Sequence, residues 1–313
     1  MRIDIKECAR LLADKDDILI LTHAHPDGDT LGCGFALCRA LMKMGKFCSV
    51  VNADEIPKKY GYLYDDIAPI KFNPKFVVAV DVATPNLLGG LDGKYHINLC
   101  IDHHLTNTEY ADDILLQDVP AACQTIYKLI KELGVEIDNR MADALYTGIS
   151  TDTGCFRYAS TTSETYRIAA DLIDLGANNG MINRAMFETK TKSYAQLERL
   201  ALDTMSFYDN DRIAIITVTQ DMYLRTGSNE TETEPLAPLT RMVEGVEIGV
   251  ILKEKPDGTC KASIRTFDTV NAAELAKAFG GGGHPQASAC RFDCDILEAK
   301  NRIISKGSEL LNR

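Results

Sequence analysis

Residues 18–30 read ILILTHAHPDGDT, an apolar run followed at once by two histidines, two aspartates, a proline and a glycine. Short apolar runs bounded by turn-forming residues are typical of buried β-strands. Four imidazole and carboxylate side chains within seven residues also form a dense supply of ligands for a divalent metal. The segment alone fits a surface loop or a metal site, and the rest of the chain decides between them.

Three further apolar runs follow in the first half of the chain, at 47–54, 76–83 and 96–104, separated by helical patterns such as residues 31–46. This alternation predicts an α/β fold, with a parallel sheet and helices on both of its faces. Three of the four runs end in acidic or imidazole residues. Because ligands gather at the carboxyl ends of parallel strands, we expect these side chains to share one sheet edge.

The second half of the chain has a different pattern. Helical segments begin at about residue 121, and strand-like runs return at 212–220, 247–254 and 260–267, followed by a helix over 271–279. We therefore expect a catalytic domain over 1–190, a connecting helix over 191–205 and a smaller α/β domain over 206–313.

Composition excludes several classes of protein. The 313 residues are 45% hydrophobic, and no apolar run approaches the roughly 18 residues that a membrane span needs, so we expect a cytoplasmic protein without a membrane partner. Ten cysteines lie scattered without a CxxC pair, which predicts free thiols in the core. A net charge of −11 disfavours long nucleic acids, whose binding depends on many Lys and Arg contacts.

Four blocks of the chain supply the candidate metal ligands. Each residue has an ordinary alternative taken singly: Asp27 could form a turn, and Asp81 could cap a loop. Together at one sheet edge they indicate a site for two cations, which needs one bridging carboxylate and terminal ligands on each side. His25 lies outside this pattern, and we expect it to be an exposed loop histidine. The blocks contribute His23, Asp27 and Asp29; Asp81; Asp102, His103 and His104; and Asp152.

The stretches HAHPDGD, AVDVA, CIDHH and STDTG resemble the four successive motifs of the DHH phosphoesterase superfamily. VEGVEIGVILKE, KASIRT and GGGGH are similar to the DHH-associated C-terminal domain, so the resemblance covers nearly the whole chain. The pairing of both domains in one chain of this length resembles the oligoribonuclease and 3′-phosphoadenosine-5′-phosphate (pAp) phosphatase subfamily.

This resemblance implies a role for each ligand. His23, Asp27 and Asp81 would hold one metal, and Asp29, Asp81, His103 and Asp152 the other, with Asp81 bridging. His104 would face the substrate phosphate, and Asp102 would orient an imidazole. Carboxylates and imidazoles together suit two Mn²⁺ ions, with Mg²⁺ or Co²⁺ as other choices.

The resemblance also implies that GGGGH forms a loop whose backbone amides face an anion. Arg265, Gly281, Gly282, Gly283 and His284 would then clamp the substrate from the second domain. Ala289 departs from the family, which tends to have glycine there, and leaves the local turn open. Arg157, just after STDTG, could contact a phosphate or serve a structural role.

The expected function is hydrolysis of short oligoribonucleotides, about two to five nucleotides long because of the acidic surface, to 5′-mononucleotides. Removal of the 3′-phosphate of pAp would use the same site. Three alternatives stay open: a phosphodiesterase for linear or cyclic dinucleotides, a RecJ-like single-strand exonuclease, and a non-catalytic nucleotide-binding sensor. The preferred substrate, the direction of degradation and a homodimeric state are not decided by the sequence.

Overall fold

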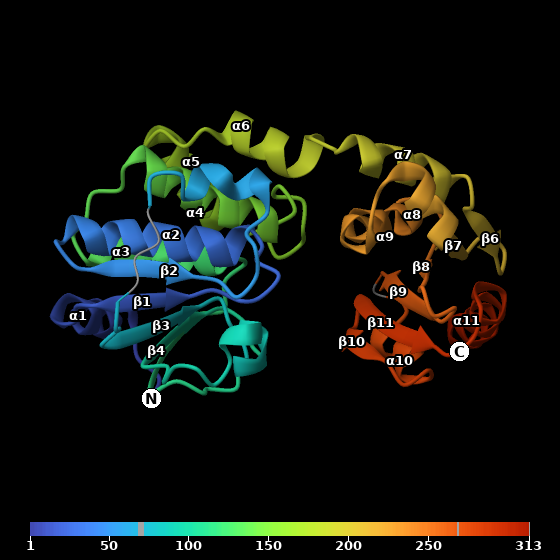
Figure 1. Cartoon of the computed structure of the whole chain (residues 1–313), viewed down its shortest axis with the longest axis horizontal. Helices are drawn as coiled ribbons and strands as arrows, with labels where there is room; N and C mark the ends of the chain where they lie inside the picture. The colour runs from blue at the N-terminus through green and yellow to red at the C-terminus, as the bar shows by residue number, and fades with distance from the viewer. Residues whose placement is uncertain (68–71, 268, 313) are drawn as a thin grey trace. The chain divides into compact units, whose positions relative to one another are not determined.

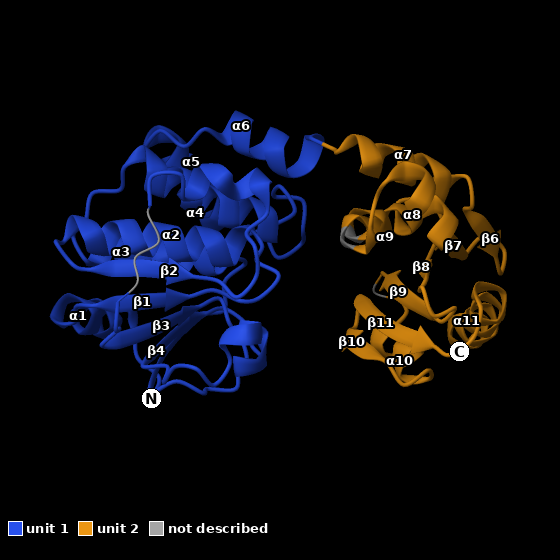
Figure 2. Ribbon diagram, in the orientation of Figure 1, with its two compact units in different colours: residues 1–189 blue, residues 190–313 orange. Residues whose placement is uncertain are grey.

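The computed structural model describes residues 1–67, 72–267 and 269–312. The chain forms two compact units, Met1–Thr189 and Lys190–Arg313 (Figures 1 and 2). Each unit has its own sheet and its own hydrophobic core. Among the described residues no helix is long and apolar enough to cross a bilayer. All ten cysteines are free, and the eight that are buried are core residues as predicted, whereas Cys155 and Cys294 are half-buried.

Unit 1 contains the predicted parallel sheet, with strand order β2-β1-β3-β4-β5; Figure 1 labels the first four of these strands. All four strand pairs are parallel, with Ile18 opposite both Cys48 and Phe76. The fifth strand was not foreseen, because its four residues carry little pattern of their own. The strands are β1 Ile18–Leu21, β2 Cys48–Val51, β3 Phe76–Val80, β4 Leu99–Asp102 and β5 Asp113–Leu116.

Helices cover one face of this sheet, where Ile18 and Ile20 point into the main core. The opposite face, with Leu19 and Leu21, packs against Leu88 of a 3₁₀ turn and against loops. The expectation of helices on both faces is therefore wrong for the described residues. The connection between β3 and β4 contains proline and several glycines and forms η2 Pro85–Leu91 instead of an α-helix. The helical elements of unit 1 are α1 Ile5–Asp14, α2 Gly28–Lys43, η1 Lys58–Leu63, α3 Ala122–Glu132, α4 Asn139–Asp152, α5 Ser163–Asp174, α6 Asn179–Asn183 and the π-turn η3 Arg184–Glu188.

Glycines allow α2 and α4 to pack closely. A Cβ on Gly28 would lie 2.4 Å from Thr151 Oγ1, and a Cβ on Gly32 would lie 2.4 Å from the Ala144 carbonyl oxygen. These two glycines are four residues apart and so share one face of α2. Their contacts place the first turn of α2 beside the last turn of α4, which ends at Asp152.

Unit 2 has a six-stranded sheet of order β10-β11-β9-β8-β7-β6, in which only β7 and β8 pair in parallel. Helix α7 belongs to this unit, where Tyr194 and Leu197 pack against Ile216 and Val218. Its elements are α7 Lys192–Leu202, β6 Ser206–Tyr208, β7 Ile213–Val218, α8 Gln220–Thr226, η4 Glu230–Leu236, α9 Ala237–Arg241, β8 Ile248–Glu254, β9 Cys260–Thr266, α10 Ala272–Lys277, β10 Gly282–His284, β11 Ala287–Phe292 and α11 Ile296–Leu311.

The glycine stretch differs from the expected open loop. Its second half forms β10, which pairs with β11 so that Gly282 lies opposite Ala289 and His284 opposite Ala287. A Cβ on Gly281 would lie 2.2 Å from the Ala289 carbonyl oxygen, so glycine is required where the segment leading into β10 approaches β11. Ala289 itself is accommodated as an ordinary strand residue between β10 and β9.

Candidate metal centre

The six side chains expected as metal ligands lie together at the carboxyl edge of the sheet in unit 1. Each of these side chains lies at or near the end of a strand or helix, which explains its position. Asp27 is the N-cap of α2 and accepts hydrogen bonds from the amides of Asp29 and Thr30 at 3.0 and 3.1 Å. Asp81 directly follows β3, and His103 directly follows β4. His23 follows β1 by two residues, and Asp152 ends α4.

The ligand atoms form two groups that share Asp81. In the first, His23 Nε2 lies 3.5 Å from Asp27 Oδ1 and 3.7 Å from Asp81 Oδ2. In the second, His103 Nε2 lies 3.3 Å from Asp81 Oδ1 and 3.5 Å from Asp152 Oδ2. Asp29 Oδ2 completes the second group at 3.9 Å from the same nitrogen. Each oxygen of Asp81 therefore faces a different group, as a bridging carboxylate requires.

Two buried atoms in this centre have no hydrogen-bond partner, Asp81 Oδ1 and His103 Nε2. Buried polar groups without a partner are costly and rare in folded proteins. Asp81 also has a backbone φ of +58°, an uncommon conformation for a residue other than glycine. Two unpaired ligand atoms that face each other across an acidic cluster are the donor set that a divalent cation would satisfy.

The electrostatics of the centre agree with this fit. Burial raises the pKa of Asp29 to about 7, with a further contribution from the charge of Asp81. Burial alone would lower the pKa of His103, but the nearby carboxylates of Asp81 and Asp29 outweigh it and raise the pKa to about 10. The metal-free centre therefore holds protons to offset its carboxylates, and cations can replace them.

Asp102 and His104 form a separate pair beside the ligands. Asp102 is fully buried, and its Oδ1 accepts a hydrogen bond from His104 Nδ1 at 2.8 Å, while its Oδ2 accepts one from Asn107 at 2.6 Å. Burial would raise the pKa of Asp102, but these hydrogen bonds lower it overall. His104 Nδ1 is also 3.6 Å from Asp81 Oδ1, yet that nitrogen is already bonded to Asp102. The Nε2 atom of His104 is thus the nitrogen left for a ligand.

One short segment that the sequence did not single out orients two of the ligands. The Val119 carbonyl accepts a hydrogen bond from His103 Nδ1 at 2.8 Å, so Nε2 is the atom presented to a metal. The amides of Ala122 and Cys123 donate to the two carboxylate oxygens of Asp29, at 2.6 and 2.9 Å. Helix α3 has Ala121 at its N-cap and no side-chain cap of its own, so Asp29 caps it from α2. In the sequence, this contact is indicated only by a helix start that lacks Ser, Thr, Asp or Asn at the capping position.

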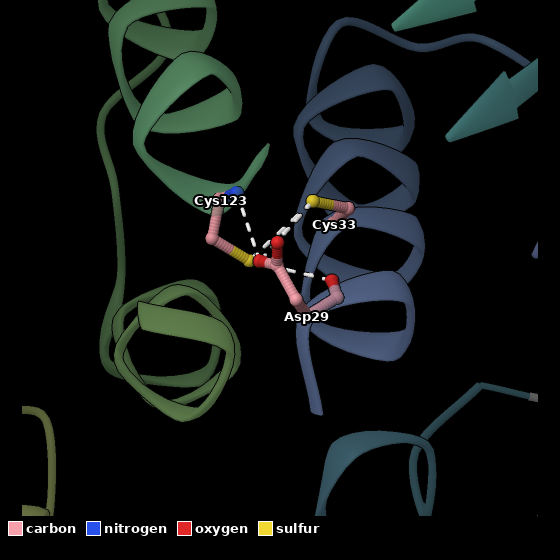
Figure 3. A group of neighbouring side chains, drawn as sticks. All are labelled: Asp29, Cys33 and Cys123. Atoms are coloured by element: carbon pink, nitrogen blue, oxygen red, sulfur yellow. Dashed lines mark hydrogen bonds between the residues drawn. The ribbon is translucent and has the colours of Figure 1, made fainter. Parts of the chain in front are cut away.

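Two cysteines lie beside Asp29, one from α2 and one from α3 (Figure 3). Cys33 Sγ is 3.5 Å from Cys123 Sγ and 3.8 Å from Asp29 Oδ1. Burial raises the pKa of both thiols well above the ordinary value, so they are protonated in the metal-free protein. We interpret this group as packing behind the metal ligand.

The remaining predicted residues lie elsewhere. His25 is almost fully exposed and pairs with Asp54 at 3.1 Å. Arg157 donates from Nε to the Gly154 carbonyl at 2.6 Å and lies over the Phe187 ring, so it stabilises the turn after α4. Arg265, Gly281, Gly282, Gly283 and His284 belong to unit 2, where Arg265 pairs with Ala287 and Ala287 with His284 across neighbouring strands.

Two groups of candidate ligands that share one carboxylate, at the carboxyl edge of a parallel sheet, fit the two-cation sites of metal-dependent hydrolases, phosphoesterases among them. The chain belongs to the DHH family: the family model "DHH family, N-terminal domain" matches residues 17–149, and the model "DHHA1 domain" matches residues 212–312.

Curated relatives match along almost the whole chain. It is 34% identical to the "Bifunctional oligoribonuclease and PAP phosphatase NrnA" of Thermus thermophilus, over 97% of this chain and 93% of the relative. It is 25% identical to the protein of the same name from Bacillus subtilis, over 90% of this chain and 91% of the relative. The crystal structure of an exopolyphosphatase-related protein from Bacteroides fragilis has the same fold, with a TM-score of 0.90 at 22% identity, covering 99% of this chain and 97% of that one.

Proposed function

We propose that the chain is a two-metal hydrolase that degrades short oligoribonucleotides, about two to five nucleotides long, to 5′-mononucleotides. We propose that it also removes the 3′-phosphate of pAp. The observation that carries the proposal is Asp81, whose two oxygens face two ligand groups and whose Oδ1 is buried without a hydrogen-bond partner. The Thermus and Bacillus relatives, both named as bifunctional oligoribonucleases and PAP phosphatases, support the choice of substrates.

The ligand groups suggest how two cations would be held. His23, Asp27 and Asp81 would bind one, and Asp29, Asp81, His103 and Asp152 the other. The mixture of carboxylates and imidazoles favours Mn²⁺. When bound, such ions neutralise the phosphate charge and supply the Lewis acidity that phosphoester hydrolysis requires.

The remaining side chains position the substrate. Asp102 fixes the ring of His104 through Nδ1, so that Nε2 can donate a hydrogen bond to a phosphate oxygen where negative charge develops. In unit 2, Arg265 and His284 supply a cation and an imidazole on one row of the sheet, and we assign to them and to the glycines of 281–283 the binding of a substrate phosphate.

One assay tests the proposal. The chain is stripped with EDTA, reloaded with Mn²⁺ and offered pAp, oligoribonucleotides of two to five nucleotides, linear and cyclic dinucleotides, and a single-stranded 20-mer. Release of phosphate from pAp together with mononucleotides from the short oligomers is the expected result. Preference for the 20-mer would favour a RecJ-like exonuclease, preference for a cyclic dinucleotide would favour that phosphodiesterase, and binding without any turnover would favour a sensor.

Two substitutions separate the roles within the site. His104→Ala is expected to lower kcat with little change in KM, because its hydrogen bond strengthens as charge develops. Arg265→Ala is expected mainly to raise KM, with both metals retained. An Arg265→Ala variant that binds pAp as tightly as wild type would contradict the role that we assign to unit 2.

A further inference from the structure

Unit 2 contains a hollow of about 710 Å³ that the proposed function does not use. One wall is formed by the end of α9 and the turn after it, and includes Arg241, Met242 and Glu244. The other wall is formed by Phe267, the residue that follows β9. Two large apolar side chains are exposed there, Met242 at 68% and Phe267 at 48%. Its size falls within the range of about 300–1,000 Å³ that is usual for small-molecule sites.

The hollow adjoins the row that carries Arg265. Gly249 on β8 pairs with Arg265 on β9, and a Cβ on Gly249 would lie 3.0 Å from the backbone nitrogen of Arg241. The missing side chain thus lets α9 lie directly on the sheet beside Arg265. Phe267 follows Arg265 by two residues and is the first residue after β9. The residue with the aromatic ring and the proposed phosphate ligand therefore belong to one short segment of unit 2.

The chemistry of the hollow suits a planar, uncharged group. The Arg241 guanidinium lies over the Phe267 ring, 5.2 Å from its centroid, so a cation and an aromatic face are stacked in its wall. Glu244 opposes the charge of Arg241, and Glu247 is paired with Arg212 at 2.7 Å. With no excess of positive charge, the hollow is poorly suited to a phosphate. Phe and Arg are the side chains on which proteins stack nucleobases.

We propose that this hollow binds a nucleobase of the substrate, with Phe267 and Arg241 as its stacking residues and Arg265 beside it for the adjacent phosphate. The inference rests on the proposed function, because it takes the ligand of unit 2 to be a nucleotide. It adds a specificity-determining site: the enzyme distinguishes nucleotides from other phosphate esters by the base as well as by the phosphate.

The composition of the chain offers a direct test, because it contains no tryptophan. Phe267→Trp creates a single fluorescent reporter in the hollow. Phe207→Trp is the matched control, since Phe207 on β6 of the same unit is exposed to a similar extent, 41%. Adenosine 5′-monophosphate is expected to quench the reporter at 267 and not the one at 207, whereas ribose 5-phosphate, which lacks the base, quenches neither.

Equal quenching by both ligands, or no quenching by the nucleotide, would overturn the base site. A signal at 267 that follows protein concentration instead of nucleotide would also overturn it, because the patch would then be a contact between copies of the chain. Steady-state kinetics give a second measurement: Phe267→Ala is expected to raise KM for a dinucleotide about 5- to 100-fold, and Phe267→Tyr to restore it. An unchanged KM in the Ala variant would contradict the proposal.

The two proposals fail in different ways. If the wild type hydrolyses no nucleotide while the nucleotide still quenches the reporter at 267, the proposed function is wrong and the base site stands. If the wild type is active and Phe267→Ala matches it on every substrate, the base site is wrong and the function stands.

Discussion

Substituting Asp29 by Asn tests the electrostatics of the metal centre in the absence of metal. The carboxylate is fully buried, and burial with the nearby charge of Asp81 raises its pKa from 3.8 to about 7. A carboxyl group whose pKa is raised in the folded state destabilises the protein increasingly as the pH rises from the unfolded value to the folded one. At about 1.4 kcal/mol for each pKa unit, the cost approaches about 4 kcal/mol at pH 8.

Asn carries no charge, so this cost is absent from the variant. In EDTA, the unfolding free energy of Asp29→Asn minus that of wild type is therefore expected to rise by about 4 kcal/mol between pH 4 and pH 8. Urea denaturation followed by circular dichroism measures it at each pH. With Mn²⁺ present, wild type is expected to be more stable than Asp29→Asn at pH 8, because the wild-type carboxylate gains a cation and the amide does not.

Asp27→Asn is the matched control, two residues away in the same motif. Burial would raise the pKa of Asp27, but the hydrogen bond and charge of His23 lower it overall. Its ionised form is thus stabilising above its unfolded pKa, and this contribution is lost as the pH falls, so the control should lose stability at pH 8 relative to wild type. A difference in unfolding free energy between Asp29→Asn and wild type that does not change with pH would refute this account of the centre. A change in that difference of the same sign for Asp27→Asn and Asp29→Asn would also refute it.

Four further predictions concern the metal, the helices and the substrate. Asp81→Ala should lose both metals and all turnover; two metals remaining by elemental analysis would contradict the bridge. His23 and His103 have pKa values of about 9 and about 10 in the metal-free protein, so Mn²⁺ uptake at pH 7.5 should release protons and tighten with rising pH, as calorimetry in buffers of different ionisation enthalpy can measure. Gly32→Ala places a Cβ 2.4 Å from the Ala144 carbonyl and should cost about 1–3 kcal/mol of unfolding free energy; a neutral effect would show that α2 and α4 can move apart. Oligomers of two to five nucleotides should be degraded far faster than a 20-mer, and equal rates would point to a longer binding track.

The sequence predicted that the candidate ligands of unit 1 meet at one sheet edge, because apolar runs and polar ends coincide there. Asp81 and His103 each follow a strand directly, so the parallel arrangement alone brings them to one edge. The contribution of Val119 and of the α3 amides was not predictable, because these contacts use backbone groups and a helix start without a capping residue does not show which carboxylate caps it. The cover of the second sheet face by a 3₁₀ turn and loops was also missed, since periodicity describes what a segment buries and not what covers it.

The structure of unit 2 was harder to predict from the sequence, because some of its contacts do not depend on side chains. A run of four glycines has no side chains with which to signal alternation, so the pairing of β10 with β11 is invisible in the sequence. The hollow beside Phe267 depends on the contact between Gly249 and α9. No sequence pattern links these two, and they meet only in the folded unit.

The capping of α3 by Asp29 limits how this centre can be transplanted or diversified. A designer who moved the six ligands onto another parallel sheet would leave the carboxylate of Asp29 without the amides of Ala122 and Cys123, and His103 without the Val119 carbonyl. The transferable module is therefore the ligand set together with the segment 119–123. Variation in a natural lineage faces the same coupling, because an insertion in those five residues would displace two ligands at once.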